Sequence, residues 1–229
     1  MIRPPCRDRP SPNHGPRRDN HGIDMLVLHY TGMADAAAAL GRLCDPEAEV
    51  SAHYLIEEDG VIWRLVPEDR RAWHAGRSQW AGGADVNSRS LGIELVNPGH
   101  GPDYRPFPEV QIEALEGLCR LILARHPIPP CHVLGHSDVA PDRKLDPGEL
   151  FDWRRLAAAG IGLWSEAWEL PPPGAGDAEL LMRRFGYADA SAVSIAAFQR
   201  HFRPAAITGL ADDETLARLV DLLKQAGVR

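Results

Sequence analysis

No stretch of the sequence approaches the ~20 consecutive apolar residues that a membrane-spanning helix requires. The first ten residues contain three prolines and three arginines. They include neither the apolar segment nor the small-residue cleavage site that marks a secretory signal. We therefore expect a cytoplasmic protein without a membrane span.

Cysteine is scarce, and basic charge is outnumbered by acidic charge. The four cysteines, at positions 6, 44, 119 and 131, include no CxxC pair, which argues against a disulfide scaffold and against a cysteine-rich metal site. The net charge of −7 argues against nucleic acid as the main partner, because phosphate binding depends on clustered lysine and arginine. These absences leave a soluble enzyme or binding protein as the open classes.

Apolar residues are present in ordinary amounts, 44% of the 229 residues, and are sufficient for a sizeable core. Residues 1–22 are rich in proline, arginine and asparagine, and we predict an irregular lead-in there. A main domain over 23–165 is followed by a Pro/Gly linker over 166–177, which is the clearest domain boundary in the chain. Residues 178–229 form the second predicted domain.

The main domain alternates apolar runs of strand length with helical patterns, which predicts an α/β fold with a mixed central sheet and helices against it. Strands are expected at residues 24–31, 51–56, 61–66, 90–96 and 132–134. The second and third of these flank an Asp-Gly pair, a strong hairpin signal. Helices are expected at residues 35–43, from Pro108 onward, and at 151–156.

The second domain is predicted to be small and all-α. Amphipathic segments near 178–186, 191–201 and 212–226 predict three short helices. Their shared core is predicted to contain Leu180, Leu181, Phe185, Val193, Phe198, Leu216, Leu219, Val220 and Leu223.

The segment 135–148 (GHSDVAPDRKLDPG) concentrates residues that carry chemistry. Its two prolines remove backbone donors and disfavour helix, so we expect a non-helical loop at the end of a strand. A catalytic zinc site needs three histidine or carboxylate ligands and one open position for water. His136 and Asp146 could supply two of these ligands. A surface loop with solvated side chains is the alternative reading of the same residues.

Two residues outside this segment strengthen the metal hypothesis. His29 lies at the C-terminal edge of a predicted strand, where α/β sheets place ligands. Glu94 lies in the middle of an apolar strand and must be paired, bound or reactive, because burying a free carboxylate is costly. With Lys144 as a cation, every role of a zinc hydrolase has a candidate residue.

Five segments in chain order carry a family resemblance. They are residues 27–31 (VLHYT), 51–56 (SAHYLI), 71–76 (RAWHAG), 91–95 (LGIEL) and 135–148. Over about residues 22–157 the chain resembles the zinc-dependent N-acetylmuramoyl-L-alanine amidases of the AmpD/AmiD type, which are related to peptidoglycan recognition proteins. Residues 178–226 resemble the three-helix peptidoglycan-binding domain, although Arg203–Ala206 departs from its usual Gly-rich turn.

The resemblance implies a ligand set and a reaction. His29, His136 and Asp146 are the implied zinc ligands, Glu94 the implied general base, and Lys144 the implied transition-state partner. The implied reaction is attack of zinc-activated water on the amide that joins muramic acid to L-alanine. Peptidoglycan or its muropeptide fragments are the implied substrates.

Six further residues are predicted to contact the substrate: Tyr30, His53, Trp73, His74, Asn87 and Arg89. Two alternatives stay open at this point. His53 also suits a structural or metal-supporting role, which we favour over a catalytic one, and Trp73 also suits core packing.

The substrate and the activity have competing interpretations. Members specialised for 1,6-anhydro substrates tend to have Arg-Cys-Asn-Asp before the base strand, where this chain has DVNS at 85–88, which weighs against strict anhydro specificity. The second domain points to larger glycans, whereas the lack of a signal points to cytoplasmic recycling. The alternative functions are a non-catalytic peptidoglycan-binding or sensing protein on the same fold, and a zinc peptidase that cuts within the stem peptide.

Overall fold

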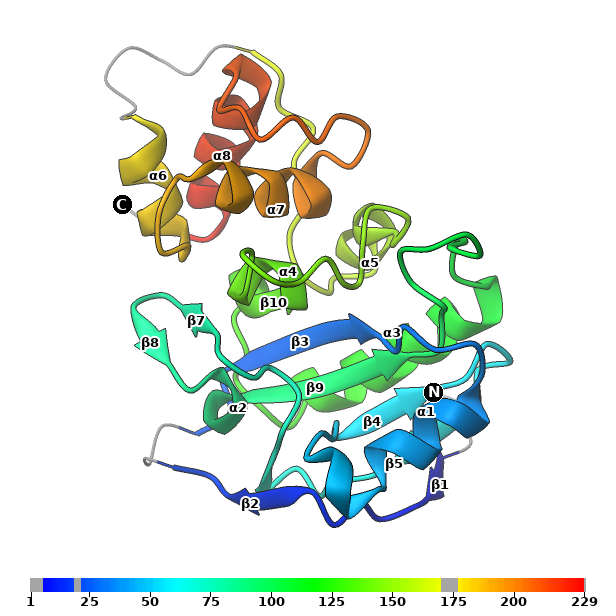
Figure 1. Cartoon of the computed structure of the whole chain (residues 1–229). Coiled ribbons are helices and arrows are strands. Elements are labelled where there is room, and N and C mark those ends of the chain that lie inside the picture. Colours follow the sequence, from blue (N-terminus) through cyan, green and yellow to red (C-terminus); the bar gives the residue numbers. More distant parts are fainter. Residues whose placement is uncertain (1–5, 19–21, 170–176, 229) are drawn as a thin grey trace.

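The computed structural model describes residues 6–18, 22–169 and 177–228 (Figure 1). The Pro/Gly run at 171–176, on which the predicted linker rests, lies outside these residues. Within them, no helix is long and apolar enough to cross a membrane.

A six-stranded sheet forms the centre of the molecule. Its strands lie in the order β1 (Cys6–Asp8), β5 (Ile62–Arg64), β4 (Tyr54–Ile56), β9 (Ser90–Leu95), β3 (Met25–Tyr30) and β10 (Val133–Gly135). All neighbouring strands are parallel except β4 and β5, which form the predicted antiparallel hairpin. The mixed sheet of the α/β prediction is therefore confirmed.

The first residues correct one prediction. Two-stranded sheets pair β2 (His14–Pro16) with β6 (Arg70–Ala72) and β7 (Gln79–Trp80) with β8 (Gly83–Ala84). The irregular lead-in is therefore wrong for its described part, because β1 extends the central sheet and β2 pairs with β6. Pro16 is tolerated in β2 because this strand has a single neighbour, β6, so that a missing N–H costs little.

Helices cover both faces of the sheet, and further helices make up residues 177–228, here called the C-terminal domain (Figure 1). They are α1 (Ala36–Leu43), α2 (Val86–Arg89), α3 (Glu109–Leu123), α4 (His136–Val139), α5 (Trp153–Ala158), α6 (Ala178–Phe185), α7 (Ala192–Phe202) and α8 (Asp213–Gln225). Short 3₁₀ turns span Pro46–Ala48 and Pro130–His132. The single helical turn α4 corrects the prediction that 135–148 contains no helix. The prolines of this segment come after the turn and therefore do not disrupt it.

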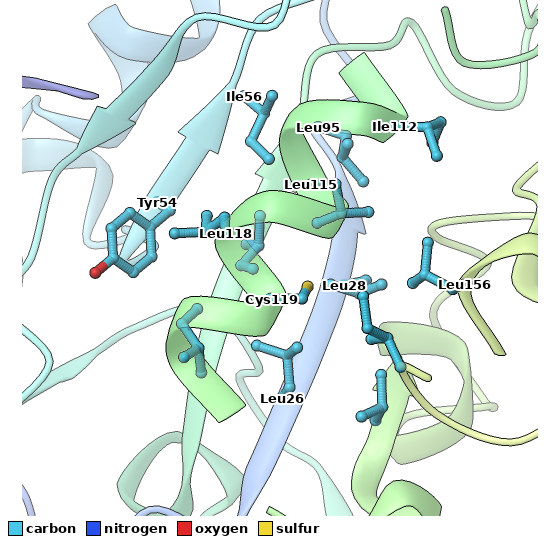
Figure 2. Packing of buried hydrophobic residues seen from close by; sticks show 14 of the residues in the cluster. Leu26, Leu28, Tyr54, Ile56, Leu95, Ile112, Leu115, Leu118, Cys119 and Leu156 are labelled. Carbon is cyan, nitrogen blue, oxygen red and sulfur yellow. The ribbon is translucent and has the colours of Figure 1, made fainter. Parts of the chain in front are cut away.

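Side chains alternate along β3, so that successive residues pack in different hydrophobic clusters on the two faces of the sheet. Leu26 and Leu28 face α3, whose residues Leu115, Leu118 and Cys119 pack on this side of the sheet (Figure 2). The residues between them point to the opposite face. That opposite face carries the candidate site at its C-terminal edge.

The C-terminal helices share a core with the sheet. Met25 and Val27 of β3 and Trp80 of β7 belong to the same buried cluster as Phe185 of α6 and Phe198 of α7. This continuity departs from the prediction of a core formed by the three helices alone. Two predicted core residues, Leu180 and Val193, are each 50% exposed.

Gly186 provides a test of this shared core. Its φ is +138°, its carbonyl accepts a hydrogen bond from the Ala81 N–H (2.8 Å), and a Cβ there would lie 2.5 Å from the Trp80 ring. We predict that Gly186→Ala lowers the free energy of unfolding by about 2–4 kcal/mol, through overpacking and an unfavourable φ. Denaturant unfolding measures the change.

Gly41→Ala is the matched control. Gly41 lies on the exposed face of α1, and a Cβ there would meet nothing within 4 Å. The same substitution should raise stability there by roughly 0.5–1 kcal/mol, because alanine restricts the unfolded chain and favours helix. Equal effects at the two glycines would contradict the packing of Gly186 on Trp80.

Candidate metal centre

The sheet brings His29 and Glu94 side by side. They are register partners on the parallel strands β3 and β9, so both side chains leave the same face of the sheet. His136 begins α4 directly after β10, the other neighbour of β3. Asp146 returns to this point because its carbonyl accepts a hydrogen bond from the Ser137 N–H (2.9 Å).

Three buried donor atoms converge at this edge of the sheet. His29 Nδ1 lies 2.9 Å from His136 Nδ1, and each of these nitrogens lies 3.0 Å from Asp146 Oδ2. The three residues are 1%, 3% and 6% exposed. Two imidazoles and a carboxylate form an N/O donor set of the kind that catalytic zinc uses, with three protein ligands.

A chain of hydrogen bonds directs the His29 Nδ1 lone pair into the triangle. The Ser90 hydroxyl donates to the Val86 carbonyl (2.6 Å), so its oxygen is free to accept from His74 Nε2–H (3.0 Å). His74 Nδ1 then accepts from His29 Nε2–H (3.1 Å). With its proton on Nε2, His29 presents an unprotonated Nδ1 to a metal.

His136 is oriented in the same way from a different direction. Its Nε2–H donates to the carbonyl of Ala75 (3.1 Å), which leaves Nδ1 as an acceptor facing His29 and Asp146. Burial lowers the pKa of His29 to about 4, so His29 is neutral and able to bind a metal at physiological pH. His29 therefore satisfies the requirement for a deprotonated ligand nitrogen, and the hydrogen bond of His136 to Ala75 directs its Nδ1 to the same point.

Asp146 supplies the negative charge of the set. Burial by itself raises the pKa of this carboxyl, but the neighbouring His136 and His29 outweigh burial and hold the pKa well below its usual range. The group is therefore ionised as a ligand must be. Its partners, two imidazoles, match the carboxylate–histidine composition of hydrolytic zinc sites.

Gly92 explains how a histidine fits behind the metal ligand. A Cβ at Gly92 would lie 2.4 Å from the His74 ring, so only glycine leaves room for that ring on the sheet. His74 is buried, and its contact with His29 gives it a supporting place behind the ligand, although it also borders the pocket. This position suits orientation of His29 better than the predicted contact with substrate.

Glu94 and Lys144 line the same pocket as the three candidate ligands. Glu94 Oε2 is buried and has no hydrogen-bond partner within the described chain. Burial raises the pKa of Glu94 well above its ordinary value, the charge of Asp146 adds to this, and Lys144 opposes it. An unpartnered carboxylate oxygen of this kind is free to accept a proton.

A pocket of about 280 Å³ opens onto these groups. It is lined by the three candidate ligands and by Tyr30, Trp73, His74, Glu94 and Lys144, together with residues of the 31–33 and 39–51 segments. Tyr30 and Trp73, both predicted substrate contacts, are therefore placed on the pocket wall. A larger hollow of about 850 Å³ beside β5 contains none of the candidate ligands.

Two predicted substrate contacts, His53 and Asn87, lie away from the pocket. His53 is completely buried, accepts the Gly92 N–H at Nδ1 (2.9 Å), and has its pKa lowered by burial to about 3. The Asn87 side-chain oxygen accepts the N–H groups of His74 and Ala75. Neither residue lines the pocket, and the placement of His53 suits a supporting role better than contact with substrate.

Arg89 and the DVNS run are also engaged within the fold. Arg89 forms an ion pair with Asp24 (2.6 Å), and Asp85 forms one with Arg71 (2.6 Å). Residues 86–89 form the short helix α2, and Arg89 lies outside the pocket wall. The prediction that Arg89 contacts substrate is therefore not supported by its placement.

Arg42 is a pocket residue that sequence reasoning did not identify. Arg42 lies in the last turn of α1, is exposed to solvent and lines the pocket. No ion pair or side-chain hydrogen bond joins Arg42 to another residue in the described ranges. Only the tertiary contact of α1 with the pocket reveals it, because nothing in its local sequence distinguishes it from a surface arginine.

The chain as a whole is similar to several known proteins. The family profile for N-acetylmuramoyl-L-alanine amidase matches residues 19–149, more than half of the chain. The chain is 40% identical over 234 residues to the N-acetylmuramoyl-L-alanine amidase AmiD of Escherichia coli (strain K12), covering 90% of this chain and 84% of that protein. It is 36% identical over 170 residues to the 1,6-anhydro-N-acetylmuramyl-L-alanine amidase AmpD of Enterobacter cloacae, covering 67% of this chain and 89% of AmpD.

Solved structures agree over almost the whole molecule. The complex of AmiD from E. coli with anhydro-N-acetylmuramic acid-L-Ala-D-gamma-Glu-L-Lys superposes with a TM-score of 0.79 at 38% identity, covering 96% of this chain and 94% of that chain. AmpDH3 from Pseudomonas aeruginosa gives a TM-score of 0.78 at 37% identity, covering 95% of each chain. The matched family range contains His29, Glu94, His136 and Asp146, and the chain belongs to the N-acetylmuramoyl-L-alanine amidase family.

Proposed function

We propose that this protein is a zinc-dependent amidase that hydrolyses the bond between N-acetylmuramic acid, or its 1,6-anhydro form, and L-alanine of the stem peptide. The observation that carries the proposal is the convergence of His29 Nδ1, His136 Nδ1 and Asp146 Oδ2 in the pocket that also contains Glu94. A non-catalytic peptidoglycan sensor would not require an unpartnered carboxylate beside a complete ligand set.

In the proposed mechanism a few pocket residues have separate roles. His29, His136 and Asp146 would hold the zinc, which would supply Lewis-acid chemistry at the scissile amide. Glu94 accepts the proton of the attacking water and passes it to the leaving amine of L-alanine. Lys144 lines the same pocket and stabilises negative charge that develops on the amide oxygen. The walls formed by Tyr30 and Trp73 orient the substrate.

Substitution of Glu94 separates metal binding from turnover. We predict that Glu94→Gln binds zinc as the native protein does but lowers kcat about 10²–10⁴-fold, because the amide cannot accept the proton. Asp146→Ala should lose zinc and activity together. Metal content by elemental analysis and kcat on a muramoyl-peptide measure the two effects. A Glu94→Gln variant with most of its activity would remove Glu94 from the mechanism.

A paired substrate assay tests the reaction itself. Purified protein is offered anhydro-muramyl tripeptide and intact cell-wall sacculi, with and without chelator, and products are identified by mass. Chelator-sensitive release of intact stem peptide is expected. Cleavage inside the stem would indicate a peptidase, and no release by zinc-loaded protein would favour the sensor. The preferred substrate would distinguish recycling from wall remodelling. It would thereby also test the cytoplasmic prediction, which goes with recycling.

Arg42 is proposed to bind a carboxylate of the stem peptide. A γ-linked glutamate, such as that named in the AmiD complex, keeps its α-carboxylate free. We predict that Arg42→Gln raises KM roughly two- to fivefold with kcat unchanged, as loss of an exposed ion pair would. A substrate whose glutamate carries an amide in place of this carboxylate is the control, and an equal KM increase on both substrates would contradict the assignment.

A further inference from the structure

The C-terminal domain contacts the turn that carries His136. Asp138 lies in α4, two residues after this ligand, and is only 1% exposed. Its Oδ2 accepts the Gly135 N–H (2.7 Å) and the Nδ1–H of His201 in α7 (2.7 Å). Its Oδ1 accepts the hydroxyl of Tyr187, which follows α6. One carboxylate therefore links the ligand-bearing turn to two parts of the C-terminal domain.

The hydrogen bonds from Tyr187 and His201 to Asp138 are buried, so the loss of either one is costly. Tyr187 and His201 are 3% and 2% exposed, so water cannot replace either partner of the Asp138 carboxylate. The His201 ring stacks on Trp153 with 3.7 Å between centroids, and the Tyr187 ring packs against Trp80 at 4.9 Å. Ring packing therefore fixes the positions of both donors, Tyr187 and His201, independently of their hydrogen bonds to Asp138.

A second polar path joins the C-terminal domain to the pocket wall. Arg200 of α7 lies 3.6 Å from Glu149, whose carboxylate is 3.0 Å from His100 Nε2. The other ring nitrogen of His100 is 2.9 Å from the hydroxyl of Tyr30. The C-terminal domain therefore contacts Asp138, two residues after His136, and Glu149, three residues after Asp146.

We propose that the C-terminal domain positions His136 for metal binding through the hydrogen bonds that Tyr187 and His201 donate to Asp138. This inference rests on the zinc site of the proposed function. Tyr187 and His201 are positioning residues, since neither touches the candidate ligands. The geometry they impose on α4 sets the direction of the His136 ring relative to His29 and Asp146.

Tyr187→Phe tests the proposal by removing one hydroxyl. Zinc affinity is measured by competition with a chromogenic chelator, together with the unfolding midpoint of the metal-free protein. We expect the affinity for zinc to fall about tenfold or more, as for groups that orient metal ligands. His201→Asn, whose amide can replace the Nδ1–H donor, should recover part of the affinity lost in His201→Leu.

Thr215→Val is the matched control. Thr215 is 1% exposed, and among the described residues its hydroxyl bonds to groups of the C-terminal domain alone, namely Asp212, Gln199 and Arg203. This variant should lose stability while its zinc affinity stays native. If Tyr187→Phe and Thr215→Val bind zinc equally at matched stability, the positioning role is overturned and the proposed function stands. Native protein that binds no zinc would instead overturn both.

Discussion

The site depends on the direction of one lone pair. Three donor atoms about 3 Å apart can form a metal site only if the nitrogens among them carry no proton. The Val86 carbonyl determines the hydroxyl direction of Ser90, and the protons of His74 and His29 follow from it. Backbone geometry near α2 thus determines the tautomer of a ligand on β3.

The need to orient His29 also explains why the interior of strand β9 contains a glycine. Glycine in a strand interior weakens the strand, since it contributes no side-chain packing. In β9, Gly92 leaves the space that the His74 ring fills, and its N–H is satisfied by His53. Buried His74 therefore supports the His29 ligand, and buried His53 supports the strand behind His74, in positions that a sequence motif alone would assign to substrate.

Strand periodicity made much of the structure predictable. Apolar runs located β3 and β9, the Asp-Gly pair located the hairpin, and His29 and Glu94 stood out as polar residues in apolar strands. What could not be predicted depends on contacts between distant segments. Examples are the placement of His53 beneath Gly92, of Arg42 on the pocket wall, and of β1 at the sheet edge.

The C-terminal domain shows why local pattern was insufficient. Amphipathic periodicity located three helices correctly but could not show what their apolar faces cover. Met25 and Val27 share a core with those helices. The match to AmpD, in contrast, covers only 67% of this chain. Deleting residues 177–228 would expose that core and leave Asp138 without two donors. Truncation would therefore confound substrate binding with metal positioning, whereas substitutions at Tyr187 and Thr215 separate them.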